Sequence, residues 1–158
     1  MKKVAIIHTS TVSLNHLKEL FKEIIPDVEL INIIDDSLLE EVKKNKGITP
    51  RIIGRMCTYA QIAESLGVDL ILNQCSSVGE AADIARRCVN TKFLKIDEPM
   101  AEKACQLGTK IGVVATVSST VKPSVNLIKH TANKLNKIVE VKDYLVKDAL
   151  DILMKENN

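Results

Sequence analysis

Short runs of apolar residues alternate along the chain with longer segments whose apolar residues recur every three or four positions. The apolar runs, typical of strands buried on both faces of a sheet, are Val4–Ile7, Val28–Ile34, Val68–Asn73, Phe93–Ile96, Ile111–Ala115 and Ile138–Val141. The segments between them have the period of amphipathic helices. Because strands that alternate with helices favour right-handed crossovers, the pattern predicts an α/β fold with mostly parallel sheets flanked by helices.

Capping residues and prolines predict where the helices begin. These positions are Ser13, the capping boxes Ser37–Glu40 and Ser77–Glu80, the pair Thr49–Pro50, Pro99 and Pro123. The helix from the second capping box is expected to run to about Cys88. Gly67 is expected just after the end of the helix that begins at Pro50, because glycine is the usual residue at that position.

The pattern divides into two similar lobes. Residues 1–97 predict a first α/β lobe with Cys75 at a strand end, and residues 98–158 predict a partial second lobe. The second lobe is incomplete in this chain, since it holds two predicted strands and no strand follows its last amphipathic helix. We therefore expect the native polypeptide to continue beyond Asn158. The alternative is that a partner chain, as in a homodimer, completes the lobe at its open sheet edge.

Composition excludes several classes of protein. The chain has 158 residues, of which 46% are hydrophobic and 27% charged, a balance typical of a globular domain. Its net charge is +2, and two Tyr, two Phe and no Trp leave few rings for bases to stack on, so we expect no nucleic-acid partner. No apolar run approaches the ~20 residues of a membrane span, and the first residues predict a strand rather than a signal peptide. We expect no membrane association, a cytoplasmic location and four free thiols.

Polar side chains follow three of the predicted strands, at the end where doubly wound sheets bind ligands. The three clusters are His8–Thr11, Asn73–Ser77 and Thr116–Thr120. The six glycines form neither a dinucleotide-binding motif nor a P-loop, and no Cys/His cluster has metal-ligand spacing. Hydroxyl and backbone N–H groups at helix starts suit a small anion, either a carboxylate or a free phosphate.

Cys75 is the leading candidate for a reactive group. It follows a strand directly and precedes a predicted helix start, where the positive end of the helix dipole favours a thiolate. The alternative is a small buried residue in a tight turn. Cys57, Cys88 and Cys105 fall within predicted helices, where we expect packing rather than catalysis. His8 ends the first strand and is either a structural or a catalytic histidine.

Three longer stretches together carry a resemblance to a known family. They are Leu72–Glu80 (LNQCSSVGE), Ile96–Glu102 (IDEPMAE) and Ile111–Thr116 (IGVVAT) running on to Ser119, Thr120 and Pro123. In order and spacing they resemble the aspartate/glutamate/hydantoin racemase family, and most closely its hydantoin-racemase-like branch. The resemblance covers essentially the whole chain. It implies two α/β lobes with a ligand between them, and cofactor-independent chemistry at a carbon next to a carboxylate or carbonyl.

In the racemases of this family, one thiolate removes the α-proton and a second thiol returns a proton to the opposite face. Cys75 matches the first cysteine, and none of the other three cysteines matches the second. The resemblance therefore implies an isomerase, a racemase or epimerase of a small amino acid, dicarboxylate or hydantoin, that is inactive as the 158-residue chain. Relatives without the second cysteine perform decarboxylation or isomerisation. The alternatives are an inactive or regulatory small-anion-binding protein of the same fold, and a flavodoxin-like domain that binds phosphate.

The resemblance also implies which residues bind the ligand. They are Asn73, Ser76 and Ser77 beside Cys75, together with the hydroxyl cluster Thr116, Ser119 and Thr120 that helps to hold a substrate carboxylate. We expect Ser10 and Thr11 of the first polar cluster to face the same anion site, with His8 as a further candidate.

Overall fold

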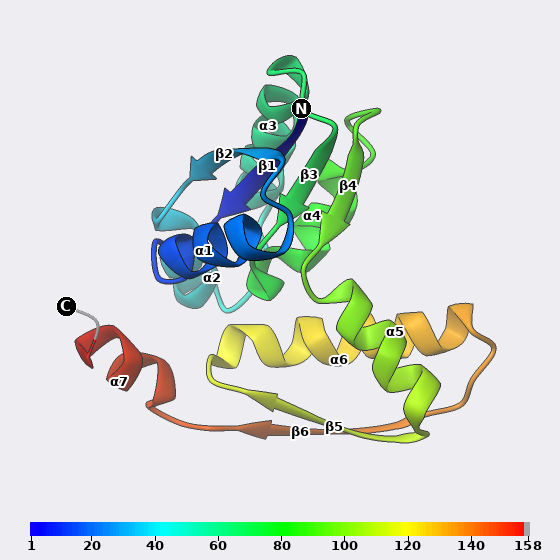
Figure 1. Cartoon of the computed structure of the whole chain (residues 1–158). Helices are drawn as coiled ribbons and strands as arrows, with labels where there is room; N and C mark the ends of the chain where they lie inside the picture. The colour runs from blue at the N-terminus through cyan, green and yellow to red at the C-terminus, as the bar shows by residue number, and fades with distance from the viewer. Residues whose placement is uncertain (157–158) are drawn as a thin grey trace. The chain divides into compact units, whose positions relative to one another are not determined.

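The structure of the protein, a computed structural model, describes residues 1–156. The chain divides into two compact units, Met1–Ile96 and Asp97–Asn158. The first unit contains a four-stranded sheet and the second a two-stranded sheet (Figure 1). Both sheets are parallel and flanked by helices, which confirms the predicted α/β class.

The four strands of the first unit are β1 (Lys2–His8), β2 (Val28–Ile34), β3 (Leu70–Asn73) and β4 (Lys92–Lys95). They lie in the order β2-β1-β3-β4, so β1 and β3 are the two central strands. Ile7 on β1 pairs in register with Asn73 on β3, and His8 pairs with Ile34 on β2. Because all four strands run in the same direction, their polar carboxyl ends meet at one edge of the sheet.

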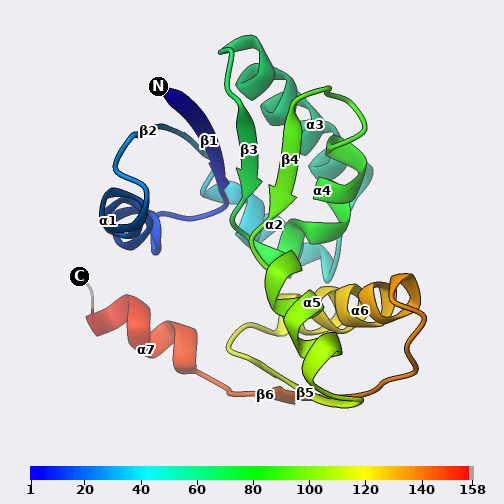
Figure 2. The same ribbon diagram turned by 45° about the vertical axis from the view of Figure 1, so that its right-hand side comes forward.

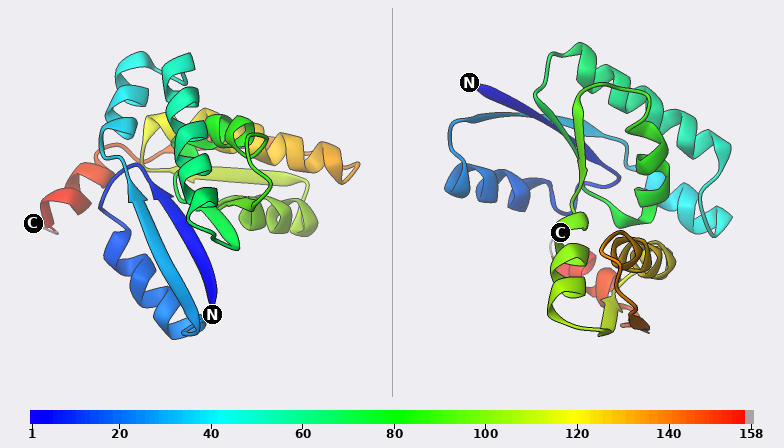
Figure 3. Two further views of the ribbon diagram at one scale, coloured as in Figure 1. Left: turned by 90° about the horizontal axis from the view of Figure 1, so that it is seen from above. Right: turned by 90° about the vertical axis from the view of Figure 1, so that its right-hand side faces the viewer.

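Helices cover both faces of this sheet. The helices are α1 (Leu14–Ile24), α2 (Ser37–Asn45), α3 (Pro50–Ser65) and α4 (Gly79–Ala85), with a 3-10 turn η1 (Ser76–Val78) before α4. Figures 2 and 3 show α1 on one face and α3 and α4 on the other. The larger core lies on the α3–α4 side, where Ile7 and Ile71 of the sheet pack with Ile52 and Met56 of α3. These four side chains are fully buried, and each contributes about 1.5–3 kcal/mol by leaving water.

The second unit is built from α5 (Glu98–Leu107), β5 (Lys110–Ala115), α6 (Ser118–Lys134), β6 (Glu140–Leu145) and α7 (Ala149–Glu156). Strands β5 and β6 pair in parallel from Lys110↔Glu140 to Ala115↔Leu145. Cys105 of α5 packs with Val113 of β5 and Ile128 of α6 in a small separate core. The helices α5 and α6 therefore cover one face of the two-stranded sheet.

The last strand differs from the prediction over Ile138–Val141. The side chain of Ile138 is 93% exposed and precedes β6. Helix α6 ends at Lys134, and Asn136 follows with a positive φ of 53°. The N–H of Lys137 donates to Ala132 O at 2.9 Å, which completes a helix-ending turn. Pairing begins only when the N–H of Glu140 reaches Thr109 O at 2.7 Å. The register with β5, rather than the apolar run, decides where the strand starts.

Several predicted helix starts are also wrong, although Thr49 does cap α3 and Gly67 does follow that helix with a φ of 69°. The predicted N-cap residues of α2 and α4 are each displaced by one position: Asp36 and Val78 hold these positions, and neither makes a side-chain cap. The helix from the second box ends at Ala85, before Cys88. Ser13 does hold the predicted N-cap position of α1, but it makes no side-chain cap hydrogen bond.

Pro123 lies inside α6 rather than at its start, because α6 begins at Ser118. Beyond the first turn a proline removes one backbone hydrogen bond and crowds the carbonyl four residues earlier, a cost that the rest of this helix must offset. Among the residues that the structure describes, no helix combines the length and apolar character needed to cross a membrane.

Candidate functional site at the carboxyl edge of the first sheet

The candidate site begins where the central strands β1 and β3 end. Beyond the last ladder pair, the N–H of Gln74 donates to Ile7 O at 3.1 Å, which continues the pairing of the two strands. The side-chain amide of Gln74 then donates from Nε2 to Ser13 Oγ at 2.6 Å. The segment that follows β3 is thus tied to the loop that follows β1. Two of the three predicted polar clusters, His8–Thr11 and Asn73–Ser77, share this edge.

Cys75 is half-buried in the turn between β3 and η1. Its carbonyl oxygen accepts two hydrogen bonds, from Asn73 Nδ2 at 2.9 Å and from the N–H of Val78 at 3.3 Å. Asn73 therefore fixes the backbone that carries the thiol. The expected helix dipole at Cys75 is wrong, because the residues after it form a 3-10 turn and α4, seven residues long, begins only at Gly79.

Two buried polar side chains stand at the ends of the central strands β1 and β3. His8 and Asn73 are both fully buried. His8 Nε2 lies 2.9 Å from Asn32 Oδ1, and burial lowers the pKa of the ring against the opposing effect of that hydrogen bond. A neutral His8 donates from Nε2 to Asn32, which leaves Nδ1 as an acceptor. Within residues 1–156, neither His8 Nδ1 nor Asn73 Oδ1 has a hydrogen-bond partner. Two unsatisfied buried polar atoms are costly and typical of functional sites.

The other predicted residues of the first unit differ in exposure. Ser10 and Ser76 are half-buried, Ser77 is buried and Thr11 is exposed. The backbone carbonyl of Thr11 accepts from the N–H of Leu14 at 3.0 Å, which closes the turn before α1. Ser10, Ser76 and Ser77 thus have restricted access to solvent, as do the neighbouring hydroxyl residues Thr9, which is buried, and Ser13, which is half-buried.

The third polar cluster belongs to the second unit, at the carboxyl end of β5. Thr116 is exposed in the link to α6. Ser119 and Thr120, which we expected in a polar turn, lie in the first turn of α6. Thr120 Oγ1 donates to Val117 O at 2.7 Å, so its hydroxyl proton is engaged while its oxygen lone pairs stay available as acceptors.

Sequence reasoning missed a charged cluster that follows β2. Asp35 accepts hydrogen bonds from Arg55, from the Tyr59 hydroxyl at 2.5 Å and from Ser37 Oγ at 2.7 Å. Arg55 also pairs with Glu41 at 2.7 Å. Burial opposes ionisation of Asp35, but the hydrogen bonds from Tyr59, Ser37 and Arg55 prevail and lower its pKa. The available signal was that Asp35 directly follows an apolar strand, as the other three clusters do.

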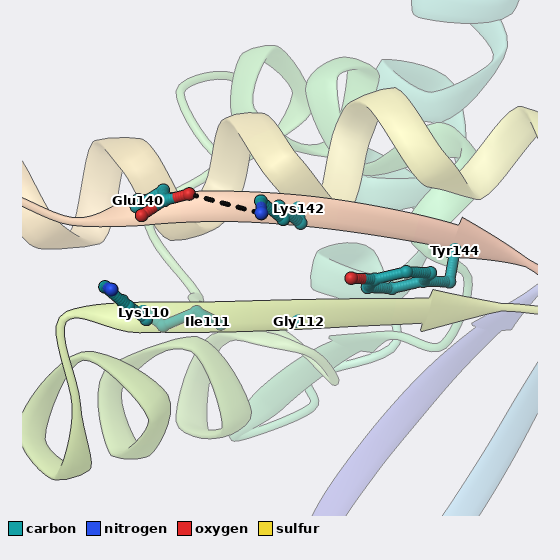
Figure 4. Close-up of a pocket in the computed structure, with 6 residues that line it drawn as sticks. All are labelled: Lys110, Ile111, Gly112, Glu140, Lys142 and Tyr144. Carbon is teal, nitrogen blue, oxygen red and sulfur yellow. Dashed lines mark ion pairs between the residues drawn. The ribbon is translucent and has the colours of Figure 1, made fainter.

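A shallow hollow of about 220 Å³ lies on the exposed face of β5 and β6. Figure 4 shows its lining, in which Lys142 pairs with Glu140 at 3.6 Å and the ring of Tyr144 extends over β5. The ring lies next to Gly112, where a Cβ would make an ordinary van der Waals contact with it at 3.7 Å. None of the predicted site residues lines this hollow. In the described part of the chain, no three His, Cys, Asp or Glu side chains are grouped to hold a metal ion.

Comparisons with known proteins identify the fold. The sequence matches no protein-family model and no curated protein. Among solved structures, glutamate racemase from Aquifex pyrophilus matches 89% of this chain at a TM-score of 0.67 and 22% identity. Aspartate racemase from Picrophilus torridus matches 98% of this chain at a TM-score of 0.61 and 20% identity. A glutamate racemase from Bacillus anthracis matches 96% of this chain at a TM-score of 0.67 and 14% identity.

The chain has the fold of the glutamate and aspartate racemases. It spans 54%, 66% and 55% of the length of these three proteins, respectively. At these identities the likeness establishes the fold, and the predicted α/β architecture with an incomplete second lobe agrees with it.

Proposed function

We propose that this protein is a cofactor-independent racemase or epimerase that acts at the α-carbon of a small amino acid, dicarboxylate or hydantoin, with Cys75 as one acid/base. The observation that carries the proposal is the position of Cys75, which directly follows a central strand at the carboxyl edge of the sheet. Ligands bind at this edge in doubly wound folds. The fold shared with glutamate and aspartate racemases supports the same reaction class.

The surroundings of Cys75 suit proton transfer at carbon. The Asn73 side-chain amide donates to the Cys75 carbonyl at 2.9 Å. The Gln74–Ser13 hydrogen bond joins the loop after β3 to the loop after β1, so both bonds restrict the backbone that carries the thiol. A positioned base of this kind contributes about 10²–10⁴-fold to a proton transfer. The hydroxyl residues Ser76 and Ser77 directly follow Cys75, and hydroxyl and backbone N–H groups are the kind of donors that stabilise a developing enolate oxygen.

The proposed step is a proton transfer with balanced charge. The Cys75 thiolate takes the α-proton, the C–H electron pair moves into the enolate of the adjacent carbonyl, and a proton is then returned to the α-carbon. Return from Cys75 itself restores the starting configuration, whereas return by a second group on the opposite face inverts it. Thr116, Ser119 and Thr120 remain the proposed residues that help to hold the substrate carboxylate.

Exchange of the α-hydrogen with solvent tests Cys75 separately from inversion. A panel of amino acids, dicarboxylates and hydantoins is incubated with the protein in D₂O, and deuterium uptake and optical rotation are both followed. We expect deuterium uptake with at least one substrate of the panel. The rate of this uptake should fall by at least about 100-fold in Cys75→Ala. Cys88→Ser, which removes an exposed thiol elsewhere, is the matched control and keeps the wild-type rate.

A second candidate is a binding or regulatory protein of the same fold. It is favoured by the positions of the other described thiols: Cys57 lies within α3, Cys88 follows α4, and Cys105 is buried in α5, so none ends a strand. A thermal-shift screen with the same panel separates the two functions. Stabilisation by a carboxylate without deuterium exchange supports the binding protein, and neither stabilisation nor exchange with any panel member contradicts both proposals.

A further inference from the structure

Two thiols that the proposed function does not use lie close together in the first unit. Cys57 Sγ on α3 and Cys88 Sγ, three residues beyond the end of α4, are 3.3 Å apart. Helices α3 and α4 lie side by side on the same face of the sheet (Figures 2 and 3). The two cysteines are 31 residues apart in the sequence, so packing of these helices brings them together.

The separation of the sulfurs is close to that needed for a covalent bond. A disulfide has an S–S length of about 2.05 Å, so the two atoms must approach by about 1.2 Å. The Cys88 backbone is held by its N–H, which donates to Ala85 O at 2.9 Å, and Cys57 lies within a continuous helix. Small rotations of the two side chains are the movement that closes the gap.

The two thiols differ in their access to solvent. Cys88 is exposed, whereas Cys57 is half-buried. Burial, together with the hydrogen bond from Cys88, raises the pKa of Cys57 to about 11. Cys57 is therefore a protonated thiol at neutral pH and reacts slowly with reagents from solution. Cys88 is the thiol that a small oxidant meets first.

We propose that Cys57 and Cys88 form a reversible intramolecular disulfide, with a low-molecular-weight disulfide as the oxidant. The Cys88 thiolate attacks one sulfur of that disulfide, forms a mixed disulfide and releases one small thiol. Cys57 then loses its proton and attacks the Cys88 sulfur, which releases the second small thiol. The two protein thiols lose two electrons and two protons, and the small disulfide gains both.

The bond ties together two segments that lead to the candidate site. Helix α3 carries Arg55 and Tyr59, which bind Asp35 at the carboxyl edge of the sheet. Helix α4 continues from the segment of Cys75 through η1. A crosslink from α3 to the end of α4 restricts the unfolded chain and so stabilises the first unit, while Cys75 stays a free thiol.

The test uses the full chain and oxidised glutathione at neutral pH. Free thiols are then blocked with iodoacetamide under denaturing conditions, and the peptides are mapped by mass spectrometry. We expect a linked pair of peptides containing Cys57 and Cys88, with Cys75 and Cys105 both alkylated. We also expect the melting temperature to rise by about 5 °C or more, and to return when the protein is reduced.

Two single variants separate the roles of the thiols. In Cys57→Ser, Cys88 has no partner thiol and accumulates as a glutathione adduct. In Cys88→Ser, Cys57 forms its glutathione adduct at least about fivefold more slowly than Cys88 does in Cys57→Ser, because Cys57 is less exposed and burial raises its pKa. A wild-type protein that stops at the Cys88 adduct, or a crosslink that includes Cys75, overturns the proposal. Neither result bears on deuterium exchange, so this proposal and the proposed function fail independently.

Discussion

Gln74 donates a side-chain hydrogen bond from Nε2 to Ser13 Oγ at 2.6 Å, across 61 residues of sequence. Gln74 stands immediately before Cys75, and Ser13 stands immediately before α1. The contact therefore joins the loop that carries the proposed catalytic thiol to the loop after β1. A polar bond between two otherwise irregular segments restricts both of them.

We predict that Gln74→Ala and Ser13→Ala each lower the free energy of unfolding by about 1 kcal/mol, since each removes one partly buried hydrogen bond. A double-mutant cycle should give a coupling energy of about 0.5–1.5 kcal/mol between the two positions. Hydrogen exchange should show faster opening of residues 9–13 in either variant. Additive effects of the two substitutions would show that the contact contributes nothing in solution.

Thr49 is the side-chain cap of α3, where its Oγ1 accepts from the N–H of Ile52 at 3.3 Å. We predict that Thr49→Ala lowers the free energy of unfolding by about 0.5–1 kcal/mol. Thr58→Ala on the same helix is the matched control. The exposed hydroxyl of Thr58 donates to Gly54 O within the helix and does not cap the helix start. Because alanine is a better helix former than threonine, we expect no loss of stability in Thr58→Ala. Equal losses in urea denaturation of the two variants would contradict the capping role.

The order and type of the elements follow from the sequence because apolar runs and helical periods are local signals. The run Val28–Ile34 predicts β2 with its observed bounds, and Thr49–Pro50 predicts the start of α3. Gly67 adopts the positive φ of 69° expected after that helix. In each case the residues that decide the structure lie within a few positions of one another.

The errors arise where a distant partner competes for a local group. Ser13 was predicted to cap α1, but its hydroxyl accepts from Gln74. Ser37 was predicted to open a capping box, but its hydroxyl accepts from Arg55, 18 residues away, while it donates to the neighbouring Asp35 at 2.7 Å. Neither Gln74 nor Arg55 is visible in a window of four residues around these serines.

The candidate site was predictable in part for the same reason. Cys75 and His8 stand directly after apolar strands, so their place at the sheet edge follows from the pattern. The expected helix dipole at Cys75 was wrong because the capping-box pattern at Ser77 does not reveal that a 3-10 turn forms first. The 3.3 Å approach of Cys57 and Cys88 depends on helix packing, which no spacing rule describes.

Asp35 lies among hydrogen-bond donors that favour its ionised form, although burial acts against ionisation. Its side chain is 10% exposed and pairs with Arg55, which is 23% exposed. We predict that Asp35→Asn lowers the free energy of unfolding by about 2 kcal/mol at pH 7, since Arg55 and Tyr59 lose their charged acceptor. Because the folded-state pKa is below the ordinary value of 3.8, this stabilisation is present above pH 3.8 and is lost as the pH falls through the folded pKa.

The difference in stability between wild type and Asp35→Asn should therefore shrink in acid denaturation series below pH 3.8. Glu40→Gln is the control on the neighbouring helix, because the Glu40–Lys43 pair at 2.7 Å is largely exposed. We expect that substitution to change stability by less than about 0.5 kcal/mol. A difference for Asp35→Asn that stays constant from pH 7 to pH 2.5 would contradict ionisation of Asp35 as the cause.

His8 gives the chain a second loss of stability on acidification, in a higher pH range than that of Asp35. Burial lowers its folded-state pKa below the ordinary 6.5, so the unfolded chain binds the proton more tightly than the folded one. Stability that depends on a neutral His8 is therefore complete above pH 6.5 and declines as the pH falls from 6.5 towards the folded pKa. We predict that the melting temperature falls between pH 7.5 and pH 5.5, and that the His8 ring titrates below pH 6.5 by NMR.

His8→Gln should remove this decline even though the variant is less stable at every pH, because glutamine does not titrate. His16→Gln, on an exposed position of α1, is the matched control and should keep the decline. The NMR titration tests the prediction even if His8→Gln folds poorly, because it is carried out on the wild-type protein. A titration midpoint at or above 6.5 would mean that the buried ring accepts a proton readily, and that Nδ1 has an anionic partner at the edge beside Cys75.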